Sequence, residues 1–422
     1  MPPTDSPKTS SPRRSRGSLL IAAVSGRALA RAAVDAGYVP LVADFFADAD
    51  TQELAHACRK MPGDLARGFQ WRSLGPALGT LAQAAPAPVL GVVYGAGFED
   101  RTHLLSRIAE RWPLLGNDAG TVETIKAPER FFALLDDLAI PHPVTVTARP
   151  RTTTGWVAKR RGGAGGSHVV PAARLQTRAA NVYYQRLIEG RAVSALFIAN
   201  GRNARVLGFS EQWTAPAPGK PWRYGGAVRP ASLSDGAAEE MSRIVISAAR
   251  ASRLKGLASA DFMLGQNHPY LIEINPRPGA TLDIFAGAAR PLLRLHVEAV
   301  RDGRLPWKTP VFEGAAAMGY VHAPKALIVP RNMIWPAWAA DLPAPGERID
   351  KQRPICTVLA RAGTRRRAKR LIEERKASVL AIIQKSKGEQ GEQEKQRRTR
   401  KPRHEETEYQ HAGRAIGARP HR

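Results

Sequence analysis

Two short apolar segments, residues 260–264 and 270–275, carry polar side chains at alternate positions, and they constrain the fold more than any other feature. The loop between them contains Gly, Asn and Pro, which is typical of a β-hairpin. A hairpin through this loop places Asp261 opposite Glu273. Because side chains alternate along a strand, Asn275 lies on the same face as Glu273. The sequence therefore predicts two carboxylates and one amide on a single face of a paired strand.

This arrangement predicts a metal site. Two carboxylates held close together repel each other unless a cation lies between them. An all-oxygen set of ligands suits Mg²⁺ or Mn²⁺. The alternative is an ordinary strand whose polar residues face solvent at every second position. That alternative accounts for one acidic residue more easily than for the whole set, with Arg277 and Gly279 following directly.

A lysine followed by a glycine-rich segment is the second feature. Lys159 lies in the predicted strand 156–160, and glycines occupy four of the next seven positions before Ser167. Glycines allow backbone N–H groups to approach phosphate oxygens closely, and the lysine adds a positive charge. The segment is not a P-loop, because no Gly-Lys-Ser/Thr ends it. A flexible turn is the alternative, and the metal site downstream favours the phosphate-binding interpretation.

Strand and helix patterns alternate at the start of the chain, which predicts a parallel α/β sheet. The segments are strands at 19–24, 39–44 and 89–94 and a helix at 28–36. The whole chain divides into a disordered leader, an α/β domain, a subdomain with the glycine-rich segment, a metal-binding subdomain, a β-rich extension with a final helix, and a disordered basic tail. Their expected limits are 1–17, 18–117, 118–190, 191–306, 307–384 and 385–422.

Composition limits the choice of partners only weakly. The formal net charge is +26, which is compatible with nucleic-acid binding, with a polyphosphate-binding enzyme or with a genome that favours arginine. Glutamates are interspersed among the basic residues of the tail, so specific nucleic-acid binding is not expected. The two cysteines lie far apart and are expected to be reduced thiols. The absence of a long apolar run predicts no membrane span, and we expect a cytoplasmic protein.

In their order and spacing, these features resemble the ATP-grasp superfamily from about residue 18 to 306. The most specific part is the Glu-Ile-Asn-Pro-Arg-Pro run at 273–278. The resemblance implies the ATP-grasp fold, in which a parallel α/β domain is followed by two α+β subdomains that clasp ATP. Segments 209–212 and 224–226 additionally look like predicted ATP-dependent carboligases of tetrahydromethanopterin and methanofuran pathways, of which tyramine–glutamate ligase is a comparable member.

The resemblance also implies roles for individual residues. Asp261, Glu273 and Asn275 would bind Mg²⁺ or Mn²⁺, while Arg277 and Lys159 would be catalytic. A ribose-binding glutamate of many family members is replaced by Ala192, for which Glu189 is the candidate substitute. ATP would be bound by Lys126, Lys159, Gly163, Gly165, Gly166, Ser167, Gln185, Arg186, Leu187, Ile188 and Glu189.

The implied activity is an ADP-forming carboxylate–amine ligase that acts through an acyl phosphate. The partners would be a small-molecule carboxylate and an amine, with a C1-carrier cofactor precursor implied by the narrower resemblance and a homodimer left open. A degenerate nucleotide sensor without turnover and a basic nucleic-acid-associated protein are the alternatives. The acceptor pocket is expected near Ser25, Gly97, Tyr224 and Arg229, between the α/β domain and the metal strand.

Overall fold

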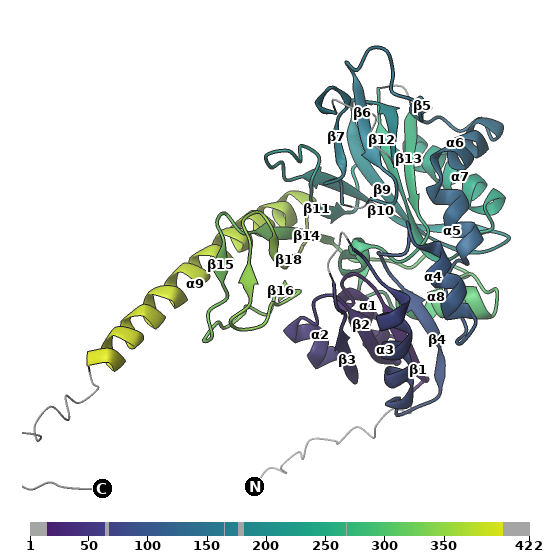
Figure 1. Ribbon diagram of the computed structural model, residues 1–422. Helices are drawn as coiled ribbons and strands as arrows, with labels where there is room; N and C mark the ends of the chain where they lie inside the picture. Colours follow the sequence, from purple (N-terminus) through teal and green to yellow (C-terminus); the bar gives the residue numbers. More distant parts are fainter. Residues whose placement is uncertain (1–14, 64–66, 164, 176–180, 267, 400–422) are drawn as a thin grey trace, which may run out of the picture.

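The computed structural model describes residues 15–63, 67–163, 165–175, 181–266 and 268–399, with side chains as far as residue 386. Residues 1–14 of the expected leader and residues 400–422 of the expected tail lie outside the described chain. No helix of the described chain is long and apolar enough to cross a membrane. The ribbon consists of an α/β domain, a large antiparallel sheet with a small sheet beside it, and a long helix that projects from the body (Figure 1).

The N-terminal domain is the expected parallel sheet, with strand order β3-β2-β1-β4. Its central strand β1 is completely buried, which explains the continuous apolar sequence Ser-Leu-Leu-Ile-Ala. The strands are β1 (Ser18–Ala22), β2 (Val39–Asp44), β3 (Ala57–Lys60) and β4 (Val89–Tyr94). The helices are α1 (Arg27–Asp35), α2 (Ala49–Leu54), α3 (Trp71–Gln83) and α4 (Thr102–Ala109).

An eight-stranded antiparallel sheet forms the centre of the molecule, in the order β13-β12-β9-β10-β11-β14-β18-β16. It therefore combines strands from the expected metal subdomain and from the expected C-terminal extension, which does not form a separate layer. Its strands are β9 (Arg191–Asn200), β10 (Ala204–Thr214), β11 (Tyr224–Arg229), β12 (Lys255–Leu264), β13 (Pro269–Asn275), β14 (Ala315–His322), β16 (Ala339–Ala340) and β18 (Pro354–Ala362).

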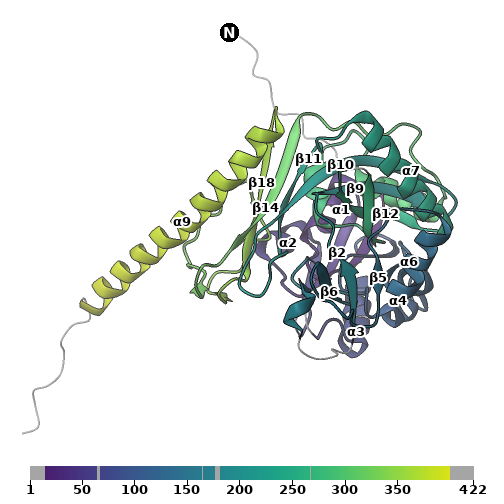
Figure 2. The same cartoon turned by 90° about the horizontal axis from the view of Figure 1, so that it is seen from above.

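Both faces of the central sheet are covered. On one face, Phe197 and Phe262 pack with residues of α5 (Ala119–Lys126), α6 (Pro128–Asp137) and α7 (Asp235–Ala251). On the other face, residues such as Leu196 pack with α1, the 3₁₀ helix η2 (Ala280–Phe285) and α8 (Leu292–Arg301). The α/β domain thus lies on the same face as η2 and α8. Seen from above, α9 (Arg365–Thr399) runs beside β14 and β18 and projects away from the body (Figure 2).

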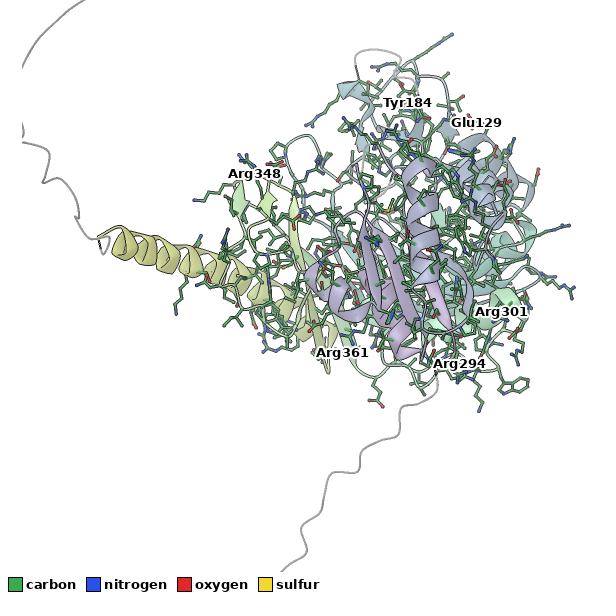
Figure 3. All side chains as sticks on the ribbon, turned by 60° about the horizontal axis from the view of Figure 1, so that its bottom comes forward. Glu129, Tyr184, Arg294, Arg301, Arg348 and Arg361 are labelled. Carbon is green, nitrogen blue, oxygen red and sulfur yellow. The ribbon has the colours of Figure 1, made fainter. Side chains whose placement is uncertain are left out.

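The small sheet has the order β5-β8-β6-β7 and contains the strand that carries Lys159. It is formed by β5 (Thr145–Val146), β6 (Trp156–Arg160), β7 (Val169–Pro171) and β8 (Val182–Arg186), with the 3₁₀ helix η1 (Ala172–Arg174). A separate ribbon consists of β15 (Leu327–Ile328) and β17 (Arg348–Ile349). Many arginine side chains, including Arg348 and Arg361, lie on the outside of the molecule, so the positive charge is dispersed (Figure 3).

The final helix α9 (Arg365–Thr399) is longer than expected. The sequence predicted its end near Gln384 and disorder from Lys385, whereas the helical backbone continues to Thr399 and projects from the body (Figure 1). Among the residues of α9 whose side chains the structure describes, Ala368, Ile372, Val379 and Ile383 are the buried apolar ones. They follow helical spacing, so this face of the helix packs on the body.

Candidate active site

The predicted pairing of the two acidic residues is confirmed: Asp261 on β12 lies opposite Glu273 on β13. A β-bulge between Asp261 and Phe262 shifts the outer part of the hairpin by one residue, so Phe262 pairs with Leu271. Asn275 completes the group by donating its Nδ2 hydrogen to Oδ2 of Asp261 over 3.1 Å. The two carboxylates and the amide therefore meet on one face.

Neighbouring strands hold Asp261 in place. Ser194 of β9 is its direct neighbour across the sheet, and Gln212 of β10 donates Nε2–H to Asp261 Oδ1 over 3.2 Å. Burial raises the pKa of the Asp261 carboxyl, and the nearby Glu273 carboxylate raises it further. Asp261 is thus fixed in orientation while it carries an electrostatic penalty that a cation would relieve.

Lys126, at the end of α5, supplies a positive charge to this group. Its Nζ contacts Oε1 of Glu273 and donates a hydrogen bond of 3.0 Å to Oδ1 of Asn275. Burial alone would raise the pKa of Glu273, but the Lys126 ammonium outweighs it and holds that pKa below its usual range. Asp118 fixes the start of α5, because its side chain accepts a hydrogen bond from the Thr121 backbone over 2.8 Å.

The donor set fits a magnesium ion. Within the described chain, no three His, Cys, Asp or Glu side chains form a metal-binding group. The oxygens available here belong instead to Asp261, Glu273 and the amide of Asn275. A hard divalent cation takes oxygen ligands and completes its shell with substrate phosphates and water. These three side chains would hold the ion. The raised pKa of Asp261 shows that its charged form is disfavoured, and a bound cation would stabilise that form.

Lys159 lies near the same two carboxylates. Its Nζ donates a 2.6 Å hydrogen bond to Oε1 of Gln185, and Gln185 donates in turn to Oγ1 of Thr145 over 3.1 Å. Both Lys159 and Gln185 are buried. Burial lowers the pKa of Lys159 to about 8, although Glu273 and Asp261 oppose this shift. The lysine is therefore a pre-positioned cation that loses its charge at mildly alkaline pH.

Nucleotide affinity should consequently fall as the pH rises through about 8, the pKa of Lys159. Below that pH the charged ammonium can pair with phosphate, and above it the neutral amine cannot. Lys159→Ala should weaken ATP binding at pH 7 by roughly tenfold, the value of one charge-assisted hydrogen bond. Calorimetric titrations with MgATP between pH 6.5 and 9.5 test this. A Lys159→Ala variant that retains the full pH dependence would contradict it.

The glycine-rich segment lies against two other parts of the chain. The backbone N–H of Tyr224 donates to the carbonyl of Gly165 over 3.0 Å, and Gly162 (φ +66°) packs on Asp100. A Cβ at Gly166 (φ +68°) would lie 1.9 Å from the carbonyl oxygen of Trp222, so only glycine fits there. Ser167 is exposed, Gly163 packs on His168, and Ala164 lies outside the described residues.

The segment expected to line the adenine pocket is only partly directed inward. Gln185 points to Lys159, whereas Arg186 points outward and places its guanidinium 5.7 Å from the Trp156 ring centroid. Leu187 and Glu189 are exposed, and Ile188 is partly buried. The structure therefore brings Gln185 to Lys159, while the Arg186 side chain is directed away from that lysine.

Arg277 is held by Glu99, a residue that the sequence reasoning missed. Nε of Arg277 donates to Oε1 of Glu99 over 2.9 Å, and both side chains are buried. The backbone N–H groups of Gly97 and Phe98 donate to the other oxygen of Glu99, over 2.8 and 3.0 Å. Although burial opposes ionisation, Arg277 lowers the pKa of Glu99 to about 2. Glu99 lies in a glycine-containing loop just after an apolar strand, and this position is the feature of the sequence that could have identified it as a site residue.

The expected acceptor pocket is corrected at Arg229. Its guanidinium is buried and donates to backbone carbonyls, among them that of Gly314 over 3.0 Å and that of Ile284. Arg229 therefore holds η2 to the sheet and is not directed toward a substrate. Ser25 donates to Asp341 over 3.3 Å, and Tyr224 lies under the glycine-rich segment.

Sequence comparison identifies one family model, an ATP-grasp domain, which matches residues 130–281. A D-alanine–D-alanine ligase of Bordetella avium (strain 197N) is 35% identical over 109 residues. That match covers 24% of this chain and 33% of the ligase, so the chain spans about a third of the length of the curated relative it matches.

Solved structures show the same architecture over most of the chain. The biotin carboxylase domain of Hydrogenobacter thermophilus 2-oxoglutarate carboxylase, a dimer in complex with MgADP, ADP and bicarbonate, aligns with a TM-score of 0.65 at 13% identity. The alignment covers 84% of this chain and 88% of that one. N5-carboxyaminoimidazole synthetase of Staphylococcus aureus, complexed with ADP, aligns with a TM-score of 0.62 at 14% identity over 86% and 97% of the two chains. At these identities the likeness concerns the fold.

Proposed function

Because the chain has the ATP-grasp fold, we propose that it is an ADP-forming carboxylate–amine ligase that requires ATP and Mg²⁺. One observation carries the proposal: a single, partly buried site brings together Asp261, Glu273 and Asn275 with Lys126. Lys159 and the paired Arg277 add two further positive charges near this group. The three cationic side chains suit the phosphates of ATP, and the carboxylate and amide oxygens suit Mg²⁺. Bound Mg²⁺ would add positive charge, because the carboxylates of Asp261, Glu273 and Glu99 otherwise balance the three cations.

In the proposed reaction, positively charged side chains would offset the repulsion between the negatively charged substrates. A substrate carboxylate that approaches the γ-phosphate brings two anions together, and Lys159 and Arg277 would offset that repulsion. Bound Mg²⁺ would supply Lewis-acid charge neutralisation at the phosphates. Glu99 keeps the Arg277 guanidinium oriented, and the glycine-rich segment would exclude water that hydrolyses an acyl phosphate. The amine would then displace phosphate and form the amide.

We place the substrates among precursors of a C1-carrier cofactor, with glutamate as a candidate partner. The support for this narrower assignment is the resemblance of segments 209–212 and 224–226 to carboligases of such pathways. Both segments lie at the site: Gln212 contacts Asp261, and Tyr224 contacts the glycine-rich segment.

ADP release with panels of carboxylates and amines tests the proposal. Release of ADP and phosphate should require Mg²⁺ and both substrates. Formation of AMP, or the absence of any ATP binding, would refute the assignment. A nucleotide sensor would bind MgATP with no stimulation by any substrate pair.

Removal of residues 387–422 should leave ADP formation within about twofold of the full chain, because this segment contains no residue of the candidate site. The last buried residues of α9 are Ile383 and Ser386, so this deletion removes none of its described buried contacts. Fluorescence anisotropy with labelled RNA and DNA tests the alternative that the protein binds nucleic acid. Any binding should fade steeply with salt. Tight, salt-resistant binding that the truncation abolishes would favour a nucleic-acid-associated protein.

A further inference from the structure

A tight turn of three residues joins the metal-binding strand β13 to Arg277. The turn consists of Asn275, Pro276 and Arg277, and the backbone N–H of Arg277 donates to the carbonyl of Asn275 over 2.8 Å. Strand β13 ends at Asn275, and a proline has no N–H to donate, so sheet hydrogen bonds do not hold the next residue. The Pro276 carbonyl therefore lies between a proposed metal ligand and a proposed catalytic arginine. We call residues 275–277 the site turn.

Asn117, which precedes α5, holds this carbonyl. The residue is 1% exposed, and its Nδ2 donates to the carbonyl of Pro276 over 2.8 Å and to that of Lys255 over 3.0 Å. Its Oδ1 accepts from the backbone N–H of Lys255 over 2.7 Å, which fixes the orientation of the amide. Lys255 begins β12, the strand that carries Asp261. One side chain thus joins the start of that strand to the site turn.

Tyr94, the last residue of β4, is a second donor at the same place. Its hydroxyl lies 2.8 Å from the carbonyl oxygen of Asn117 and 3.4 Å from that of Pro276. Burial raises the pKa of the Tyr94 hydroxyl, and the Glu99 carboxylate raises it further, so the group stays protonated and donates. A Cβ at Gly116 would lie 2.7 Å from the tyrosine ring, so the loop before α5 packs directly on that ring.

The same part of the chain therefore holds both the side chain and the backbone of Arg277. Glu99 follows β4 and pairs with the guanidinium, while Tyr94 and Asn117 hold the carbonyl one residue ahead of Arg277. A small displacement of a catalytic group from its productive position lowers the rate strongly. The hydrogen bonds to Pro276 are thus placed where they would affect the position of the guanidinium.

We propose that Tyr94 and Asn117 are positioning residues, which hold the site turn so that the Arg277 guanidinium meets the transferring phosphoryl group. This inference rests on the ligase function proposed above. The effect should concern the transition state more than the bound nucleotide, because only the transferring group depends on Arg277 in this proposal. Lys159 is held separately by Gln185 and does not depend on the site turn.

Tyr94→Phe tests the proposal, because it removes the hydroxyl and keeps the ring. MgADP is titrated calorimetrically with and without aluminium fluoride, which mimics the phosphoryl group in transfer. Aluminium fluoride should tighten MgADP binding to the wild type. Tyr94→Phe should reduce this tightening by about fivefold, the usual effect of one hydrogen bond, and leave the affinity for MgADP alone unchanged. Asn117→Asp replaces the donor to Pro276 by an acceptor and should reduce the tightening at least as much.

Tyr38→Phe is the matched control. Tyr38 is a buried tyrosine of the same domain, and its charged neighbours are Arg16 and residues of α8. This variant should respond to aluminium fluoride as the wild type does. In an Arg277→Lys background, Tyr94→Phe should cause no further loss beyond about twofold, because its effect passes through Arg277.

A purely structural role predicts a different result. It would lower the melting temperature of Tyr94→Phe while aluminium fluoride acts equally on variant and wild type. That result, a failure of Tyr94→Phe to fold, or a full loss that persists in the Arg277→Lys background would overturn the inference and leave the ligase proposal standing. Failure of the wild type to bind MgADP would refute the ligase proposal and this inference with it.

Discussion

Glu273→Gln should lower ADP-forming turnover by about two to three orders of magnitude while the chain stays folded. The substitution keeps the shape of the side chain but removes one of the two carboxylates that would bind Mg²⁺. It also removes the charge partner of Lys126. Because Asp261 is destabilised by the Glu273 carboxylate, loss of that charge partly offsets the lost ion pair, and the fold should tolerate the change. Steady-state ADP release and circular dichroism measure the two effects.

Glu373→Gln is the matched control, since Glu373 lies on the exposed surface of α9 with 68% of its side chain accessible. That variant should retain wild-type turnover and stability. Raising Mg²⁺ should restore part of the activity of Glu273→Gln if the lost function is metal binding. If Glu273→Gln turns over normally, the metal site lies elsewhere. If it unfolds, Glu273 has a structural role.

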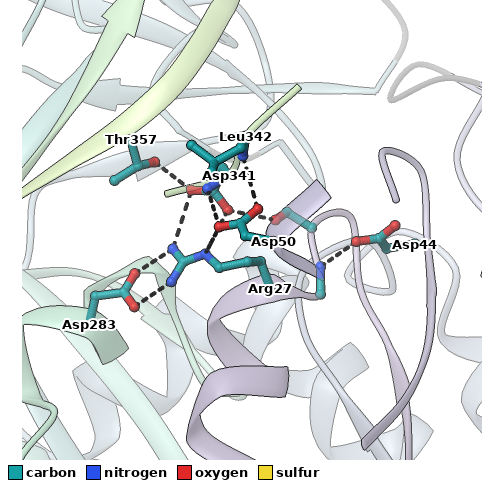
Figure 4. A network of polar contacts seen from close by, with 9 residues as sticks. Arg27, Asp44, Asp50, Asp283, Asp341, Leu342 and Thr357 are labelled. Carbon is teal, nitrogen blue, oxygen red and sulfur yellow. Dashed lines mark hydrogen bonds and ion pairs between the residues drawn. The ribbon is translucent and has the colours of Figure 1, made fainter. Parts of the chain in front are cut away.

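Arg27→Met should destabilise the chain by about 3–5 kcal/mol, the usual effect of removing one partner from a buried ion pair. Arg27 is 6% exposed at its side chain and contacts Asp283 near the central sheet and Asp341 beside β16 (Figure 4). Burial disfavours the charge of Arg27, and the two aspartates outweigh it, so its pKa is raised. Without the guanidinium, the buried carboxylate of Asp283 and the partly buried carboxylate of Asp341 would lose this cation. Urea denaturation measures the loss.

The size of this effect depends on burial, so an exposed arginine provides the control. Arg348→Met removes a pair with Asp350 in which both side chains are at least 70% exposed, and it should change stability by less than about 0.5 kcal/mol. Combining Arg27→Met with Asp283→Asn should recover part of the loss, because one uncompensated charge disappears. Equal stability of Arg27→Met and the wild type would show that the network is not a structural connection.

Local sequence patterns determined the parts of the fold that depend on neighbouring residues. The predicted strands at 39–44, 89–94 and 156–160 coincide with β2, β4 and β6. The pairing of Asp261 with Glu273 was also predictable, because a short hairpin loop fixes which residues face each other. The β-bulge was not, since its only sign is a shift of one residue in an otherwise regular pattern.

Only the tertiary structure decided which distant residues share a site. Glu99 and Arg277 are 178 positions apart, and Arg27 and Asp341 are 314 positions apart, so no local pattern links them. Strands β10 and β11 were not recognised as strands, because their glycines and polar residues obscure the alternation that a half-buried strand shows. Asp48 is a further example. Its charge is visible in the sequence, but its burial near Asp44, Asp50 and Asp341 results from packing between the α/β domain and the C-terminal strands. The sequence determined which chemical groups are present and their local order, while long-range packing set the dielectric and the charged neighbours that decide what each group can do.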